Sequence, residues 1–245
     1  MSTSAGSSAA SGVAHGELEN EPDSVNAGKK GPLKIAPHPK GYPMIQTIYS
    51  QGEVPFSVSN WHSDVTFASR PPIGSILLAR AAPPVGGDTM FCDAYAMYEG
   101  LSPKLKEQLE GLEAFHQGDP FAHGIVGQDA VHPILRTHPE TGRTTLYMGA
   151  PFTKRIVGME PEESQALMDR LRLESGRPEC CCRFRWEDGS MAMWDNRACQ
   201  HYGVGDFWPY KRLMERVTIL DYNEEAKRPY YQPGRIVERA AVAKL

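Results

Sequence analysis

The chain has 245 residues, of which 40% are hydrophobic and 23% are charged, a composition that suits one large domain with a sizeable core. Its formal net charge of −4 lacks the basic footprint of a nucleic-acid-binding protein, so we expect no nucleic-acid partner. A small anionic substrate would have to be attracted by local positive charge, because the net field of the protein does not favour it.

The expected cellular compartment follows from the cysteines and the hydropathy of the chain. Five cysteines are present, and three of them are consecutive at residues 180–182. Neighbouring residues of a strand point to opposite faces, so this run does not indicate a disulfide framework. No apolar stretch approaches the length of a membrane span, and the N-terminus lacks a signal-peptide pattern. We therefore expect a cytoplasmic protein in a reducing compartment, with no membrane partner.

Short strands are the elements expected along most of the chain. Residues 1–32 are rich in Ser, Ala, Gly and Glu without apolar periodicity, which predicts a mostly flexible tail. Residues 33–245 are expected to form a single domain. Apolar runs separated by Pro and Gly predict strands at Trp61–Phe67, Ser75–Ala79, Thr144–Met148, Cys181–Trp186, Ala192–Trp194 and Arg212–Leu220.

Two helices are also predicted. Ser102 and Pro103 form an N-cap and a first turn that predict a helix over Lys104–Leu112. A second helix is predicted over Glu160–Leu173, because small and apolar residues repeat there with helical spacing. The face that they form comprises Ser164, Leu167, Met168 and Leu171. Strands outnumber helices and no β-α-β alternation occurs, so the expected fold class is mainly β with flanking helices, an antiparallel β sandwich or jelly roll.

The segment Asn60–Phe67, N-W-H-S-D-V-T-F, contains an H-x-D pair. In the predicted strand, positions i and i+2 share a face, so His62 and Asp64 would point the same way and bind one ion. With a distant second histidine they would form the facial triad of non-haem Fe(II) oxygenases, which leaves three coordination positions open. An isolated H-x-D pair is a weak signal, and the alternative is a surface strand with a polar face.

A second segment, Trp194–Tyr202, supplies the candidate third ligand. It places Trp, Asp, Asn and Arg just ahead of His201. His132 and His138 are competing candidates, but both lie beside a proline in what is predicted to be a loop.

The strand predicted at Arg212–Leu220 carries two arginines with same-face spacing. The residues on that face are Arg212, Met214, Arg216 and Thr218. Turning two arginines toward a core is costly unless each meets an anion. A guanidinium group binds a carboxylate or a sulfonate through paired hydrogen bonds. In the alternative, this face is solvated and the opposite face points inward, which would bury Glu215.

Together, the segments N-W-H-S-D-V-T-F, G-G-D-T and W-D-N-R-x-x-x-H, followed by Arg212 and Arg216, closely resemble the taurine dioxygenase (TauD/TfdA) family of Fe(II)- and 2-oxoglutarate-dependent dioxygenases. The resemblance runs from about Gly16 to about Asp221. It implies a double-stranded β-helix, Fe(II) as cofactor, and 2-oxoglutarate and O2 as cosubstrates.

The resemblance also implies a role for each matched residue. The iron ligands would be His62, Asp64 and His201. The residues that bind the far carboxylate of 2-oxoglutarate would be Thr89 and Arg212. The residues that contact the prime substrate would be Arg216, Val65 and Phe152. Association through outer helices is common in the family, so a homo-oligomer is also expected.

The implied reaction is hydroxylation of a small anionic substrate, with release of succinate and CO2. An alkyl sulfonate such as taurine, or a related sulfate ester, is the expected substrate. The alternatives are a dioxygenase of the same family that acts on an aryloxyalkanoate or another carboxylate, and a non-catalytic relative that binds a metal or an oxo acid.

The sequence departs from the family pattern near its start. Taurine-specific members carry a His and a Tyr that contact the substrate after a Gly-Glu-Leu segment, whereas Gly16–Leu18 is followed here by Glu19–Pro22. Glu21 would repel a sulfonate if it faced the pocket. Family members usually carry several dozen residues before this point, so part of the sheet is expected to lack its cover.

Overall fold

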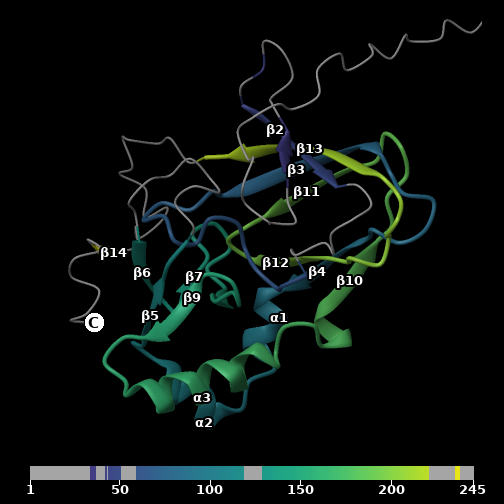
Figure 1. Cartoon of the computed structure of the whole chain (residues 1–245). Helices are drawn as coiled ribbons and strands as arrows, with labels where there is room; N and C mark the ends of the chain where they lie inside the picture. Colours follow the sequence, from purple (N-terminus) through teal and green to yellow (C-terminus); the bar gives the residue numbers. More distant parts are fainter. Residues whose placement is uncertain are drawn as a thin grey trace, which may run out of the picture. The chain divides into compact units, whose positions relative to one another are not determined.

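The computed structural model of the chain describes residues 34–36, 42, 44–50, 59–118, 129–220 and 235–237. Contacts divide the chain into residues 1–30 and 31–245, and the second unit contains all of the described residues (Figure 1). The predicted tail over residues 1–32, including Glu21, lies outside the described residues. The flexible tail and the single following domain therefore stay predictions.

Strands predominate among the described residues. The strands are β1 Lys34–Ala36, β2 Ile45–Ser50, β3 Gly74–Ala81, β4 Thr89–Asp93, β5 Glu113–His116, β6 Asp129–Pro133, β7 Leu135–Thr137, β8 Thr144–Leu146, β9 Thr153–Ile156, β10 Cys181–Phe184, β11 Met191–Asp195, β12 Cys199–Gly203, β13 Arg212–Ile219 and β14 Arg235–Val237. The helices are α1 Ala94–Glu99, α2 Pro103–Leu109, α3 Pro161–Arg172 and the short 3-10 helix η1 Pro178–Cys180. The predicted class, mainly β with flanking helices, is confirmed.

Two antiparallel sheets carry four of the five residues predicted to bind metal and cosubstrate, namely His62, Thr89, His201 and Arg212. The larger has the order β1-β2-β13-β3-β11, so β13 lies between β2 and β3 (Figure 1). The smaller has the order β10-β4-β12, and a single bridge between His62 and His201 extends it by one residue. Neighbouring strands come from distant parts of the chain, as in other jelly rolls. The remaining strands form the sheets β14-β6-β5-β9 and β7-β8.

Five of the six predicted strands are present, with small differences at their ends, as β3, β8, β10, β11 and β13. The strand predicted at Trp61–Phe67 is wrong. Only His62 makes a β bridge there, and residues 64–67 form a turn. Val65 has a φ of 52°, a left-handed conformation that β-branched residues rarely adopt. Every residue from 62 to 67 is buried, so the segment has no solvent face that an alternating strand pattern could match.

Both predicted helices are present. The Ser102 hydroxyl accepts a hydrogen bond from the backbone N–H of Leu105, at 3.3 Å, which caps α2. Helix α2 ends at Leu109 rather than the predicted Leu112, because Gly111 adopts a left-handed φ of 75° just beyond it. The buried residues of α3 are those predicted, namely Ser164, Leu167, Met168 and Leu171. No described helix has the length and hydropathy needed to cross a membrane.

The helices cover one hydrophobic core. Leu109 of α2 and Leu171 of α3 are fully buried in it with Leu146 of β8 and Ile156 of β9. The one polar residue on the buried face of α3, Ser164, accepts a hydrogen bond of 2.8 Å from the backbone N–H of Ile156. This hydrogen bond explains why a hydroxyl is tolerated at a core position.

Replacing Leu171 by Ala is expected to lower the free energy of unfolding by about 2–5 kcal/mol, because the lost side chain leaves a cavity in a packed core. Leu173→Ala is the matched control: that side chain is 69% exposed, so a change below about 0.5 kcal/mol is expected. Urea denaturation measures both values. Equal losses in the two variants would contradict the packing of α3.

Candidate metal centre

Two imidazoles and a carboxylate from distant parts of the chain converge in one buried group. The candidate ligand atoms of His62, Asp64 and His201 all lie within 4.8 Å of one another. Nε2 of His201 lies 3.8 Å from Oδ1 of Asp64, and the ring centroids of the two histidines are 4.2 Å apart. These are the three residues that the sequence predicted as iron ligands, and they are close enough to hold one ion.

Backbone pairing positions the two histidines. The N–H of His62 donates to the carbonyl of His201 at 3.1 Å, and the N–H of His201 donates to the carbonyl of His62 at 2.8 Å. Asp64 reaches the same point because the chain turns after the bridge. The sequence therefore predicted the grouping of His62 and Asp64 but not its cause, which is a turn and not the period of a strand.

Burial keeps both imidazoles neutral. Nδ1 of His62 donates to the carbonyl of Asn60 at 2.7 Å, which leaves the lone pair of Nε2 available to a metal. Burial lowers the pKa of His62, although the nearby Asp64 carboxylate opposes this. Burial, with a smaller contribution from His62, lowers the pKa of His201 to about 3. A neutral imidazole is the form that binds a metal ion.

The carboxylate of Asp64 is kept ionised in a buried position. Burial alone would raise the pKa of Asp64, but the adjacent positive charge of Arg216, with smaller effects of the two histidines and the Ser75 hydroxyl, holds that pKa well below its usual range. Nη1 of Arg216 donates to Oδ1 of Asp64 at 2.8 Å. The Ser75 hydroxyl donates to Oδ2 at 2.7 Å. Two neutral imidazoles and an ionised carboxylate are the donor set that a non-haem ferrous ion requires, so the residues present fit this metal.

Asn196 links the turn to the larger sheet. Its Oδ1 accepts from the backbone N–H of Asp64 at 3.4 Å and from the indole N–H of Trp194 at 2.9 Å. Its Nδ2 donates to the Ser75 hydroxyl at 3.1 Å. In the sequence, Asn196 stands out only as part of W-D-N-R, and the role of Ser75 was missed. No local signal marks Ser75, because its contact arises from the position of β3 beside the turn.

Arg216 lies beside the metal group, as its spacing on the predicted strand required. Besides Asp64, its Nε and Nη2 donate to Oε1 of Gln46 at 3.0 and 2.7 Å. Gln46 is its cross-strand partner on β2, and sequence reasoning missed this residue. Only 11% of the Arg216 side chain is exposed, so its charge is directed into the interior.

Arg212 and Thr89 are both buried, in different surroundings. Nε of Arg212 donates to the carbonyl of Gly87 at 3.0 Å, and burial lowers the pKa of Arg212 to about 10 although Asp88 opposes this. The arginine therefore stays charged at neutral pH. The hydroxyl of Thr89 accepts from the indole N–H of Trp186 at 3.0 Å. Gly87 has a φ of 71°, and a Cβ there would meet Cγ of Pro83 at 2.6 Å, so only glycine fits.

An apolar wall adjoins the metal group. Val65 is buried and packs with Phe67, Ala68 and Phe152. The ring of Phe152 lies edge-on to that of His62, with centroids 6.0 Å apart. Val65 and Phe152 therefore lie close together and beside a candidate ligand, although their role as substrate contacts stays a prediction.

The competing histidines lie elsewhere. His132 is on β6, so its predicted loop position is wrong; the strand continues through it because its ring is fully buried. Its Nε2 donates to the carbonyl of Ala68 at 3.0 Å. His138 follows β7, and its Nε2 lies 3.0 Å from Oδ2 of Asp195. Neither belongs to the metal group, but His132 supports the turn that carries Asp64.

A second buried histidine, His116, supports the same turn. Its Nδ1 lies 2.9 Å from the hydroxyl of Thr66, and its ring packs edge-on against that of His132 with centroids 5.3 Å apart. Burial holds the pKa of His116 well below its usual range, and burial followed by the charge of Arg136 lowers the pKa of His132 to about 3. Both histidines are therefore neutral in the folded protein, and sequence reasoning missed this role for either of them.

A model of the family described as "Taurine catabolism dioxygenase TauD, TfdA family" matches residues 15–218. The chain belongs to this family. The TauD/TfdA family is a family of Fe(II)- and 2-oxoglutarate-dependent dioxygenases. In this member, His62, Asp64 and His201 form the candidate facial triad.

Relatives within the TauD/TfdA family differ in their substrates. The chain is 37% identical over 194 residues to an alpha-ketoglutarate-dependent sulfate ester dioxygenase of Pseudomonas putida, over 72% of this chain and 63% of the relative. It is 34% identical over 177 residues to an alpha-ketoglutarate-dependent 2,4-dichlorophenoxyacetate dioxygenase of Cupriavidus pinatubonensis, over 68% and 61% of the two chains. For three of the curated relatives that it matches, this chain covers only 49% to 63% of the relative's length.

A solved structure confirms the fold. The crystal structure of a taurine dioxygenase from Burkholderia xenovorans is similar with a TM-score of 0.69 at 35% identity, over 84% of this chain and 71% of that chain. The double-stranded β-helix predicted from the resemblance is therefore confirmed. Because the relatives act on a sulfate ester, an aryloxyacetate and taurine by name, family membership does not fix the substrate.

Acidification is expected to destabilise the protein through the buried histidine pair. The unfolded chain binds protons at histidines below about pH 6.5, whereas folded His132 does not until about pH 3, so the free energy of unfolding falls as the pH drops from 6.5 toward 3. Each histidine can change the free energy of unfolding by at most about 1.4 kcal/mol per pH unit. Urea denaturation at pH 7.5 and 5.5 measures it, with His132→Gln expected to show a smaller change. A stability independent of pH over this range would contradict two neutral buried histidines.

Removing the Ser75 hydroxyl tests the support of the carboxylate. Ser75→Ala is expected to weaken Co(II) binding about 10- to 100-fold, because partners that orient a metal ligand typically contribute that much. Anaerobic titration followed by the visible spectrum of Co(II) measures the affinity. Ser190→Ala removes a hydroxyl from a turn outside the metal group and is the control. Equal affinities in the two variants would contradict the role of Ser75.

Proposed function

We propose that this chain is an Fe(II)- and 2-oxoglutarate-dependent dioxygenase that hydroxylates a small alkyl sulfonate or sulfate ester, with release of succinate and CO2. The observation that carries the proposal is the buried group of His62, Asp64 and His201, whose ligand atoms lie within 4.8 Å of one another. The adjacent guanidinium of Arg216 supports an anionic substrate. The cytoplasmic location and the homo-oligomer stay predictions from the sequence.

The three ligand residues would hold Fe(II). Bound iron supplies the oxidising chemistry, in which dioxygen is reduced while 2-oxoglutarate is decarboxylated to succinate. The protein contributes donors in the correct protonation state: neutral imidazoles from His62 and His201, and an ionised carboxylate from Asp64. Three protein ligands leave coordination positions for the oxo acid and for dioxygen.

Arg212 would bind the far carboxylate of 2-oxoglutarate. Its guanidinium is buried and charged, and a charged acceptor in such a place forms a strong, directional pair. The Thr89 hydroxyl would donate a further hydrogen bond. Both side chains are buried, so bulk water would compete only weakly with the cosubstrate for their hydrogen bonds.

Arg216 would bind the anionic group of the substrate. Within the part of the chain that the structure describes, its Nε and Nη2 donate to one acceptor, the neutral amide oxygen of Gln46. A sulfonate or sulfate would displace this amide, because a charged acceptor forms a hydrogen bond about twice as strong as a neutral one. The apolar wall of Val65 and Phe152 would then face the substrate carbon and exclude water from it.

Three variants test these roles by succinate release. His62→Ala is expected to abolish Fe(II)-dependent succinate formation. Arg212→Gln is expected to raise the KM for 2-oxoglutarate about 10- to 100-fold. Arg216→Gln is expected to raise the KM for the prime substrate by a similar factor. Both follow because a hydrogen bond to a charged group contributes about 1.5–3 kcal/mol. Arg80→Gln, a change at a side chain that is 55% exposed, is the control. Wild-type KM values in both site variants would contradict the assignment.

A substrate panel separates the candidate functions. Alkyl sulfonates, alkyl sulfates and aryloxyacetates are supplied in turn with Fe(II), 2-oxoglutarate and oxygen, and succinate is measured. Faster turnover of an aryloxyacetate would favour the carboxylate alternative over the sulfonate or sulfate ester. Anaerobic formation of the visible band of Fe(II) with 2-oxoglutarate, followed by no succinate with any substrate, would favour a non-catalytic relative.

A further inference from the structure

Two separate turns carry the apolar wall of the candidate metal centre. Val65 lies in the turn after the bridge, and Phe152 lies in a turn just before β9. In the second turn, the backbone N–H groups of Phe152 and Thr153 both donate to the carbonyl of Gly149, at 3.2 and 2.9 Å. Among the described residues, no pair of strands joins the two turns. Other contacts must therefore fix their separation.

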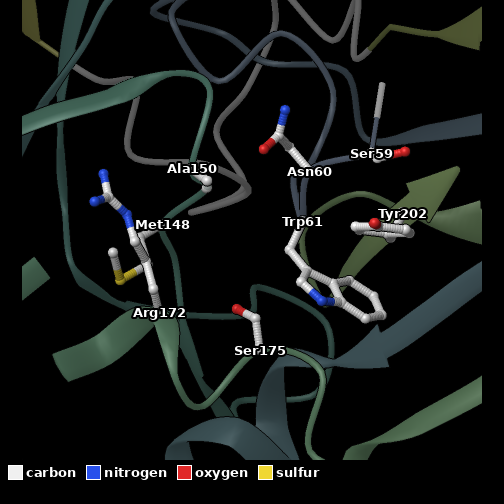
Figure 2. Close-up of a pocket in the computed structure, with 9 residues that line it drawn as sticks. Ser59, Asn60, Trp61, Met148, Ala150, Arg172, Ser175 and Tyr202 are labelled. Carbon is white, nitrogen blue, oxygen red and sulfur yellow. The ribbon is translucent and has the colours of Figure 1, made fainter. Parts of the chain in front are cut away.

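A pocket lies against the turn that carries Phe152. Its volume is about 140 Å³, and Figure 2 shows Met148 and Ala150 on its wall. The backbone N–H of Ala150 donates to the carbonyl of Trp61 at 3.1 Å beside this pocket. A pocket provides few packing contacts, so the position of Phe152 also depends on what β5 contributes.

The end of β5 contacts both turns. The backbone N–H of Gln117, just after β5, donates to the carbonyl of Phe152 at 2.9 Å. His116, the last residue of β5, is the cross-strand partner of Thr153. Nδ1 of His116 lies 2.9 Å from the hydroxyl of Thr66 and 3.5 Å from that of Thr153. One ring nitrogen therefore contacts a residue of each turn.

A histidine at this position has a cost in stability. His116, Thr66 and Thr153 are all buried. Nε2 of His116 is also buried, and it has no hydrogen-bond partner in the described part of the chain. An apolar side chain would avoid the cost of this unpaired atom, but it would lose the contacts of Nδ1 with the two hydroxyl groups. What the histidine contributes is therefore the connection between the two turns.

We propose that His116 is a positioning residue, which fixes Val65 relative to Phe152 and so sets where the body of the prime substrate lies beside His62. The inference rests on the proposed function, in which Val65 and Phe152 face the substrate carbon. The ring of Phe152 lies edge-on to that of His62 with centroids 6.0 Å apart, so a displaced wall changes the distance between the substrate and the metal group. A misplacement of about 1 Å is enough to slow a reaction about 100-fold.

Two variants of His116 test the polar contact without turnover. Asn and Leu have the same branched shape, but only His116→Asn keeps a polar atom at the place of Nδ1. Iron-free, full-length protein labelled with 4-fluorophenylalanine gives eight ¹⁹F signals, and Phe152→Leu identifies that of Phe152. His116→Leu is expected to shift or broaden the Phe152 signal, and His116→Asn to keep it close to that of the wild type. Both variants lack the imidazole, so its ring-current effect cancels between them. The same Phe152 signal in the two variants would overturn the proposal.

Turnover measures the consequence for the substrate. With the panel substrate that the wild type hydroxylates, His116→Leu is expected to have a KM for that substrate at least about five-fold above that of His116→Asn, because one hydrogen bond is lost. The KM for 2-oxoglutarate is expected to be equal in both. A merely structural role would lower the active fraction, and hence kcat, without changing either KM. Equal substrate KM values would contradict the proposal. If the wild type turns over no substrate, the proposed function fails, and the ¹⁹F comparison alone decides the role of His116.

Variants of Thr66 cover the case in which His116→Leu does not fold. Thr66→Val removes the hydroxyl that Nδ1 of His116 contacts, whereas Thr66→Ser keeps it. Thr66→Val is expected to change the Phe152 signal more than Thr66→Ser does. Thr145→Val is the control, because this buried hydroxyl donates to the carbonyl of Arg136 on β7, and it is expected to leave the signal unchanged. Equal Phe152 signals in the two Thr66 variants would overturn the proposal.

Discussion

The buried, ionised carboxylate of Asp64 is the constraint on which the site depends. An isolated charge in this position would be costly, and the structure offsets that cost with the guanidinium of Arg216 and the hydroxyl of Ser75. These partners come from β13 and β3 of the larger sheet, whereas the histidines belong to the bridge on the smaller one. The metal group therefore forms only when both sheets are in register.

The turn after the bridge, which carries Asp64, also contacts strands β5 and β6 of a further sheet. Its left-handed residue, Val65, is held by burial and by two hydrogen bonds, between His116 on β5 and Thr66 and between His132 on β6 and the carbonyl of Ala68. A strained backbone conformation persists only where the surroundings fix it. The buried histidines therefore have two roles. His62 and His201 are candidate metal ligands, whereas the neutral His116 and His132 support the turn.

Features with a local period could be predicted from the sequence, and those set by long-range pairing could not. The spacing of Arg212 and Arg216 on a strand, and of the buried face of α3, follows from periods of 2 and 3.6 residues. The pairing of His62 with His201 and the contact of Arg216 with Gln46 depend on sheet register, which no local pattern encodes. The motif predicted which residues converge, while the turn that brings Asp64 to them was mistaken for a strand because all of its residues are buried.

Anomalous diffraction at the iron absorption edge, from crystals loaded anaerobically with Fe(II), tests the central claim most directly. We expect a single strong peak, within bonding distance of an imidazole nitrogen of His62, a carboxylate oxygen of Asp64 and an imidazole nitrogen of His201. A peak bonded to other residues, or an iron-loaded crystal in which these three groups bind nothing, would contradict it.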